Sequence, residues 1–201
     1  MPTKSPRRRV TKSATLALII VCLVGFTSCN RSSTNKPAEQ SAVPSGGSTT
    51  PNQCAIPFNG DFVNDTAGVI ASDSKIKLEQ KLDTLKSVGS IDFAVVTVKT
   101  TNEQPIADYS LALARCWEVG GSNPDKAGLL LLLATDDRKW HLQISRSMEK
   151  VLSNDEIQHA ASFMTAQLRQ GNYSEGIDEC VNATIRTIAP RRKFSMDTSG
   201  K

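Results

Sequence analysis

The sequence predicts an α/β fold in which helices cover both faces of a small mixed sheet, an α/β/α sandwich. Two short segments, Ile91–Val98 and Gly128–Ala134, are apolar almost throughout, which is typical of strands buried on both faces. Segments with helical spacing of apolar residues lie before, between and after these strands. With a third, half-polar strand they give the element order α-β-α-β-β-α-α.

The first two helices flank the first buried strand. Apolar residues recur at helical spacing from Leu78 to Val88, between a Ser72 cap and Gly89. A second helical stripe runs from Ile106 to Trp117 and ends at the glycine pair 120–121. Both helices are therefore expected to have one apolar face that packs against the sheet.

A third strand is predicted from Trp140 to Ile144, where apolar residues alternate with His141 and Gln143. The link that precedes it, Thr135–Arg138, is short, so this strand should be antiparallel to its predecessor. The strand, helix and strand between Ile91 and Ala134 should form a right-handed parallel crossover. The sheet is thus expected to be mixed, with an antiparallel edge.

Two helices close the domain. Ser153 and Glu156 have the spacing of a capping box before an apolar stripe that runs from Ile157 to Leu168. The last helix carries a stripe from Ile177 to Ile188 and is expected to end at Pro190.

The charge of the chain is concentrated in a leader. The sequence has 24 Lys and Arg against 20 Asp and Glu, but residues 1–28 hold five of the basic residues and no acid. The remaining chain is close to neutral, which argues against nucleic acid as a partner.

The leader predicts export. A basic stretch is followed by the apolar run Ala14–Phe26, which is too short to span about 30 Å of hydrocarbon, so residues 1–28 indicate a signal peptide. The ending Thr27-Ser28-Cys29 resembles a bacterial lipobox, which implies lipidation of Cys29 and a membrane-anchored lipoprotein outside the cytosol in the cell envelope. Ordinary signal cleavage nearby, with Cys29 as a spare thiol, is the alternative.

Flexible segments are expected on both sides of the folded region, residues 58–190. Residues 29–57 predict a linker, because 18 of the 24 residues from Asn30 to Gln53 are Ser, Thr, Pro, Gly, Asn or Gln. Residues 191–201 predict a basic disordered tail. Its charge run Arg191–Lys193 is interpreted as solvated, and contact with a membrane surface is the alternative.

Motifs for well-known chemistry are absent from the sequence. It has no GxxxxGK[ST], no GxSxG and no HExxH, and its two histidines, His141 and His159, are interpreted as surface or half-buried residues. One disulfide and one odd thiol are expected among Cys54, Cys116 and Cys180, and the sequence leaves the pairing open.

Seven pieces of the folded region together resemble the TPM domain family. They are Phe62–Ile70 (FVNDTAGVI), a helix with the Val-rich strand after it, Cys116–Gly120 (CWEVG), Gly128–Ala134 (GLLLLLA), Asp137-Arg138, Met148-Glu149 and Arg169–Gly176 (RQGNYSEG). The resemblance implies an α/β/α sandwich in a secreted or membrane-anchored protein. Acid phosphatase activity and calcium binding have been attributed to some members.

Five acidic residues are candidates for a metal site. The hairpin is expected to bring Asp125 near Glu149, and Asp65 joins them if its turn lies at the same end, giving oxygen ligands that suit calcium. The alternative is Asp136 and Asp137, beyond the carboxyl end of a parallel strand, where open α/β sheets usually bind ligands. Structural roles are open for all of them: a turn or cap for Asp65, a salt bridge for Glu149, a polar hairpin turn for Asp136 and Asp137, and solvation of its loop for Asp125.

The first functional hypothesis is therefore a lipid-anchored envelope domain that binds a protein partner, in assembly or quality control, with calcium as a cofactor. The alternative is a metal-dependent acid phosphatase, with Arg138 and Arg146 as anion contacts. A tethered structural domain without a small ligand is the third hypothesis. The sequence leaves open whether the protein is an enzyme.

Overall fold

The computed structural model describes residues 54–121, 123, 126–196 and 198. The predicted signal peptide, Cys29, most of the predicted linker and Asp125 lie outside the described residues. The fold includes residues 54–57, which we expected to belong to the linker: Ile56 is buried, and its carbonyl oxygen accepts a hydrogen bond of 2.9 Å from the indole N–H of Trp117.

A four-stranded mixed sheet forms the centre of the fold. Its strands are β1 (Val63–Asp65), β2 (Ile91–Val98), β3 (Ala127–Ala134) and β4 (Lys139–Ile144). They lie in the order β1-β2-β3-β4. The first three strands are parallel and β4 is antiparallel to β3, which confirms the predicted mixed sheet with an antiparallel edge.

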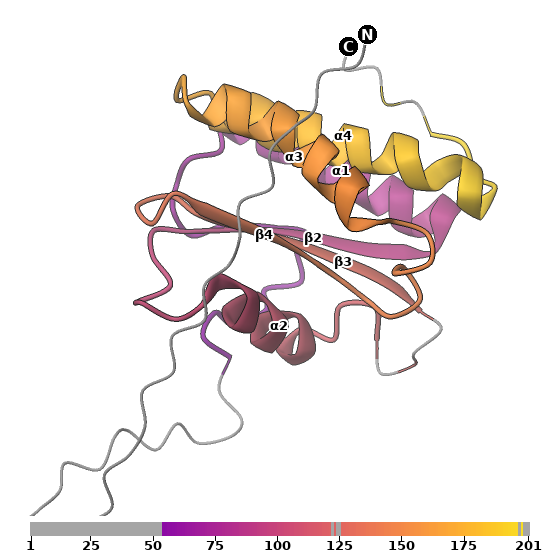
Figure 1. Ribbon diagram of the computed structural model, residues 1–201, viewed down its shortest axis with the longest axis horizontal. Coiled ribbons are helices and arrows are strands. Elements are labelled where there is room, and N and C mark those ends of the chain that lie inside the picture. The colour runs from indigo at the N-terminus through magenta and orange to yellow at the C-terminus, as the bar shows by residue number, and fades with distance from the viewer. Residues whose placement is uncertain (1–53, 122, 124–125, 197, 199–201) are drawn as a thin grey trace, which may run out of the picture. The chain divides into compact units, whose positions relative to one another are not determined.

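Helices cover both faces of this sheet. They are α1 (Ser72–Gly89), α2 (Ile106–Cys116), α3 (Asn154–Leu168) and α4 (Tyr173–Arg192). Figure 1 shows α1, α3 and α4 together on one face and α2 alone on the other, as the α/β/α prediction requires. None of the described helices has the length and apolar character that crossing a membrane needs.

Two hydrophobic clusters lie on the two faces of the sheet, and β3 belongs to both. Leu129, Leu131 and Leu133 pack in the cluster under α1, α3 and α4, whereas Leu130 and Leu132 pack in the cluster over α2. Successive side chains of a strand point to opposite faces. The uninterrupted run of leucines therefore follows from the burial of both faces, which confirms the predicted buried strand.

Strand β1 is the one element that the sequence pattern did not indicate. It has three residues, of which only Val63 is fully buried, and Asn64 and Asp65 favour turns. Its pairing with β2 is parallel, with Val63 opposite Val95. The observed order is thus β-α-β-α-β-β-α-α.

The helix ends agree with the predictions in part. The capping box of Ser153 and Glu156 is confirmed, because each side chain accepts from the backbone N–H of the other residue. Helix α1 begins at Ser72 as a helical residue, with Ala71 at the N-cap position instead of Ser72. The expected end of the last helix at Pro190 is wrong, since α4 continues to Arg192. A proline so near the end of a helix removes one hydrogen bond of the last turn only.

The segment after Pro190 takes part in the fold. The guanidinium of Arg191 donates a hydrogen bond of 2.8 Å to Glu156 of α3 and another of 2.6 Å to the carbonyl oxygen of Val151. Phe194 packs against the main core, next to Gly89 at the end of α1. The basic segment that we expected to be disordered from residue 191 therefore begins inside the domain.

The cysteines pair in one of the ways that the sequence left open. Cys54 and Cys116 form a disulfide across 62 residues of sequence, which joins the start of the described chain to the end of α2. Cys180 is a free, buried thiol in α4, and burial raises its pKa to about 12.

Candidate functional site

The three parallel strands have their carboxyl ends at the same end of the sheet. Asp65 ends β1 and lies opposite Thr97 near the end of β2, while Asp136 and Asp137 follow the end of β3. Open α/β sheets usually bind ligands at the carboxyl ends of their strands, and three of the five candidate carboxylates lie there.

Asp65 holds the turn that leaves its strand. Its carboxylate accepts hydrogen bonds from the backbone N–H groups of Val69 at 3.1 Å and Ile70 at 2.9 Å, and one from the hydroxyl of Thr97. These three bonds tie the loop before α1 to the end of β2. The turn role that the sequence left open for Asp65 is therefore the one that the structure shows.

Asp137 has a similar role between β2 and β3. Its Oδ2 accepts from the backbone N–H of Thr101 at 2.9 Å and from the Thr101 hydroxyl at 3.1 Å. The backbone hydrogen bond is the main cause that lowers the pKa of Asp137. Its neighbour Asp136 is exposed and accepts one hydrogen bond, at 3.2 Å, from the hydroxyl of Thr135.

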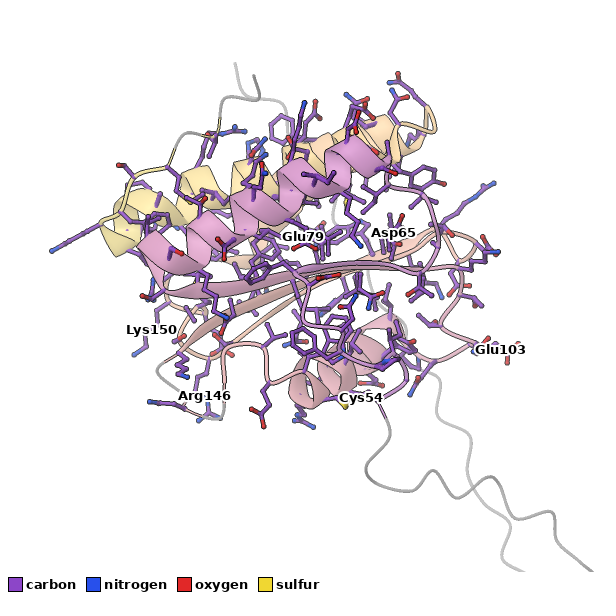
Figure 2. All side chains as sticks on the ribbon, turned by 180° about the vertical axis from the view of Figure 1, so that it is seen from behind. Cys54, Asp65, Glu79, Glu103, Arg146 and Lys150 are labelled. Carbon is purple, nitrogen blue, oxygen red and sulfur yellow. A yellow bond between two sulfur atoms is a disulfide. The ribbon has the colours of Figure 1, made fainter. Side chains whose placement is uncertain are left out.

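Glu149 lies at the opposite end of the sheet, where the parallel strands begin. Strand β4 runs antiparallel to β3, so the segment that follows it emerges where the parallel strands begin. The structure therefore does not bring Asp65 and Glu149 together, and Asp125 lies outside the described residues. Figure 2 shows Asp65 and Arg146, which precedes Glu149 by three residues, on opposite sides of the domain.

The expected set of three carboxylates thus does not assemble from Asp65 and Glu149. Within the part of the chain that the structure describes, no group of three or more His, Cys, Asp or Glu side chains has the arrangement needed to hold a metal ion. The expectation depended on which end of the sheet held the Asp65 turn. That end could not be assigned without recognising β1.

Sequence reasoning missed Glu79, which closes one edge of the sheet. Its carboxylate accepts the backbone N–H of Phe62 at 3.0 Å and that of Val63 at 2.7 Å, so α1 is fastened directly to β1. Glu79 lies in Figure 2 where α1 faces the sheet. A glutamate within an amphipathic helix carries no sequence signal of such a role, because its partners are backbone groups of an unpredicted strand.

A cavity lies at the carboxyl ends of the parallel strands, between the β3–β4 hairpin and the turn that joins α3 to α4. Its volume is about 560 Å³. Cationic and aromatic side chains dominate the polar part of its lining, which comprises Thr135, Arg138, Lys139, Trp140, Thr165, Arg169 and Tyr173. No acidic side chain is among the described residues that line it. We call it the cationic cavity.

The lining of the cationic cavity comes from two distant parts of the sequence. Arg138 and Lys139 belong to the hairpin, and Arg169 follows α3. Arg138, one of the two anion contacts that the sequence predicts, lines this cavity. The other, Arg146, is exposed at the opposite end of the strands. Arg169 was part of a recognised segment, but no spacing rule connects it with the hairpin.

At the amino end of β3, the backbone of the strand packs closely against the loop that follows α2. Gly128 packs against Gly120, so that a Cβ on Gly128 would lie 2.6 Å from the Cα of Gly120, and Gly120 has a φ of 83°. Only glycine fits such a contact without displacement of backbone. This contact explains the first glycine of the pair that follows α2, Gly120.

The two histidines have different surroundings. His141 lies half-buried on β4, and burial lowers its pKa by disfavouring the charged imidazolium. His159 is exposed on α3 and packs against Phe163 with ring centres 5.1 Å apart. Neither lines the cationic cavity.

Comparisons with known proteins agree with this fold. A family model described as the TPM domain matches residues 63–187. The solution NMR structure of the N-terminal domain of a protein from P. gingivalis is 28% identical, with a TM-score of 0.62, over 68% of this chain and 87% of that one. No match was found among curated proteins.

Two further NMR structures share the fold at lower identity. The BA42 protein of the psychrophilic bacterium Bizionia argentinensis is 16% identical, with a TM-score of 0.54, over 60% of this chain and 82% of that one. The N-terminal domain of the cg2496 protein of Corynebacterium glutamicum is also 16% identical, with a TM-score of 0.50, over 76% and 93%.

Proposed function

The chain belongs to the TPM domain family, and from this premise we propose that it is a lipid-anchored, extracytoplasmic domain that binds a protein partner in the cell envelope. The proposal has three parts: a binding site on the domain, an anchor at Cys29, and calcium as a cofactor. Each part has its own support and its own test.

The observation that carries the binding function is the lining of the cationic cavity. Arg138, Lys139 and Arg169 supply charge that attracts an anionic group, and Trp140 and Tyr173 supply apolar surface. Its lining includes threonine hydroxyls, but among the described residues no His, Asp, Glu or Cys lines it to act as a base or nucleophile. Such a lining suits holding a group better than cleaving it.

Crosslinking in living cells tests the binding function. We would replace Lys139 by a photoreactive phenylalanine analogue, with replacement of the exposed Asp83 on α1 as the matched control. We expect one discrete protein adduct from position 139 and none from position 83. Absence of any adduct from position 139, from Asp83 and from exposed positions on α2 would contradict a partner-binding function.

The location outside the cytosol is supported by the disulfide between Cys54 and Cys116, since such bonds persist in oxidising compartments. Metabolic labelling with an alkyne fatty acid tests the anchor. We expect Cys29→Ser to abolish both the label and membrane fractionation, and Cys22→Ser, in the leader, to leave both unchanged. Label that persists in Cys29→Ser would refute the anchor.

One observation favours the alternative, a metal-dependent acid phosphatase. The cations that suit a carboxylate also suit a phosphate ester. Hydrolysis of p-nitrophenyl phosphate across acidic pH, with and without calcium, separates the two functions. Turnover that disappears in an Asp136→Asn/Asp137→Asn variant would support the phosphatase, whereas turnover that survives this change and changes at the other acidic candidates points to a contaminating enzyme.

For calcium we propose the Asp136–Asp137 turn. Asp136 is exposed and, among the described residues, accepts a hydrogen bond from the Thr135 hydroxyl alone, so most of its lone pairs are available to a cation. Asp65 and Asp137 instead accept hydrogen bonds from backbone N–H groups. We expect millimolar calcium to raise the melting temperature of the wild type and of an Asp73→Asn control. It should not do so for Asp136→Asn, and an unchanged wild type would refute calcium binding.

A further inference from the structure

The two edges of the sheet are protected to different degrees. Strand β1 is three residues long, and Glu79 occupies the N–H groups of Phe62 and Val63. Strand β4 has six residues in continuous register with β3, without proline, and Lys139 is its only charged residue. Natural sheets usually blunt a free edge with charge, proline or a bulge, so the described β4 edge is open to another strand.

The register shows which backbone groups point away from the sheet. The N–H of Ser145 donates to the carbonyl oxygen of Gly128 at 2.8 Å, so Ser145 and every second residue before it bond toward β3. Trp140, Leu142 and Ile144 therefore direct their N–H and C=O groups outward. One of these groups is occupied, because the side chain of Gln143 donates to the carbonyl oxygen of Ile144 at 3.1 Å.

Trp140 connects this edge with the cationic cavity. Its backbone belongs to the outward set of β4, while its side chain lines the cavity beside Arg138 and Arg169. A strand that paired with β4 would thus run directly to the mouth of the cavity at the hairpin end. The charges there call for an anionic group in that strand, because the lining itself supplies no carboxylate among its described residues.

Charge also argues against a second copy of the chain as the occupant. If two β4 strands paired antiparallel with Leu142 opposite Leu142, the symmetric register would place Arg138 opposite Arg146 of the other copy. Like charges directly opposite each other are destabilising. The edge therefore fits an acidic partner better than itself.

We propose that β4 and the cationic cavity form one composite site that binds an extended, acidic segment of a partner protein. The segment adds a fifth strand to the sheet along Trp140–Ile144, and a carboxylate of the segment enters the cavity lined by Arg138, Lys139 and Arg169. Backbone hydrogen bonds hold the strand and the cavity selects for acid. This inference rests on the proposed partner-binding function and names the chemistry of the partner.

Peptide selection tests the composite site. A displayed library of random decapeptides would be selected on the immobilised full chain, and the best binder measured by fluorescence anisotropy. We expect enrichment of Asp or Glu beside an alternating β-rich stretch, and about a tenfold loss of affinity in Arg169→Ala. Arg146→Ala, the matched control at the opposite end of β4, should have an affinity within about twofold of that of the wild type. Equal loss in both variants, or no acidic binder, overturns the proposal.

N-methylation of the selected peptide tests strand addition without altering the protein. Methyl groups on every second amide should abolish binding in one of the two alternating sets and leave the other set unaffected, because only one set faces β4. Equal binding of both sets would show an anion site without strand pairing and overturn the proposal. If the full chain forms dimers that the peptide dissociates, β4 is an interface between two copies of the chain, and this outcome also overturns the proposal.

These outcomes are separable from failure of the proposed function. If the photoreactive residue at position 139 gives no adduct but one placed on α2 does, partner binding stands and the composite site is refuted. If no exposed position gives an adduct, both are refuted.

Discussion

The contact between Glu79 and β1 makes a sharp prediction, because one side chain fastens a three-residue strand to the fold. Glu79→Ala removes both acceptors and leaves the N–H groups of Phe62 and Val63 part-buried without a partner. The other side of β1 still pairs with β2, so the strand loses its attachment to α1 only. We therefore expect local loosening of β1 together with a global loss of stability.

The magnitude follows from the number and kind of bonds lost. A hydrogen bond to a charged group contributes about 1.5–3 kcal/mol, and water can partly replace these two because the site is part-buried, so we expect a loss of about 3 kcal/mol in the free energy of unfolding. For a domain of this size that corresponds to a fall of roughly 10 °C in melting temperature. Glu79→Gln keeps one acceptor at the site and should lose about half as much.

Urea unfolding and amide hydrogen exchange measure the two effects. Asp83→Ala, an exposed acid-to-alanine change on the same helix, is the control and should change stability by less than about 0.5 kcal/mol. In Glu79→Ala the amides of Phe62 and Val63 should exchange much faster than in the control. If the two variants unfold at the same urea concentration, Glu79 does not fasten β1 and the argument fails.

Three further predictions concern an ion pair, the disulfide and a close backbone contact. The hydrogen bond from Arg191 lowers the pKa of Glu156 from 4.5 to about 2, so the stability it contributes is present above the ordinary pKa and is lost as the pH falls toward 2. The difference in melting temperature between wild type and Glu156→Gln should therefore shrink on acidification. Cys54→Ser should cost about 4 kcal/mol in urea unfolding, because the disulfide closes a loop of 62 residues in the unfolded chain. Gly128→Ala should cost about 2–3 kcal/mol, because its Cβ meets the backbone of Gly120 at 2.6 Å.

Each of these has an outcome that contradicts it. A difference between wild type and Glu156→Gln that is constant with pH would show that the ion pair does not contribute through ionisation. Equal stability of oxidised and reduced wild type would show that the disulfide does not constrain the unfolded chain. A Gly128→Ala variant as stable as wild type would show that the loop after α2 moves aside freely.

The long elements could be predicted because burial imposes a pattern on them. The leucine run of β3 is buried on both faces, and the stripe of α3 begins at a capping box whose two partners, Ser153 and Glu156, are three residues apart. These signals lie within one element and need no knowledge of the rest of the fold. The family resemblance, which the TPM domain match to residues 63–187 confirms, rests on the same segments.

What could not be predicted depends on contacts between distant segments. Strand β1 is too short to show an alternation of apolar and polar residues. Because this strand was not predicted, the end of the sheet at which Asp65 lies could not be predicted either. Pro190 is tolerated because α4 ends two residues later and Arg191 is held by α3. The cationic cavity gathers residues about thirty positions apart, which no local motif connects.

The disulfide between Cys54 and Cys116 also decides how mechanical load enters the domain. A pull on the chain before residue 54 passes through the sulfur atoms to the end of α2, on the face of the sheet opposite to α1, and bypasses β1. Without this bond the same pull would act along the backbone toward the shortest strand and peel it away first. Tension applied to the N-terminal side of the domain is thus carried by the disulfide, and the shortest strand lies outside its path.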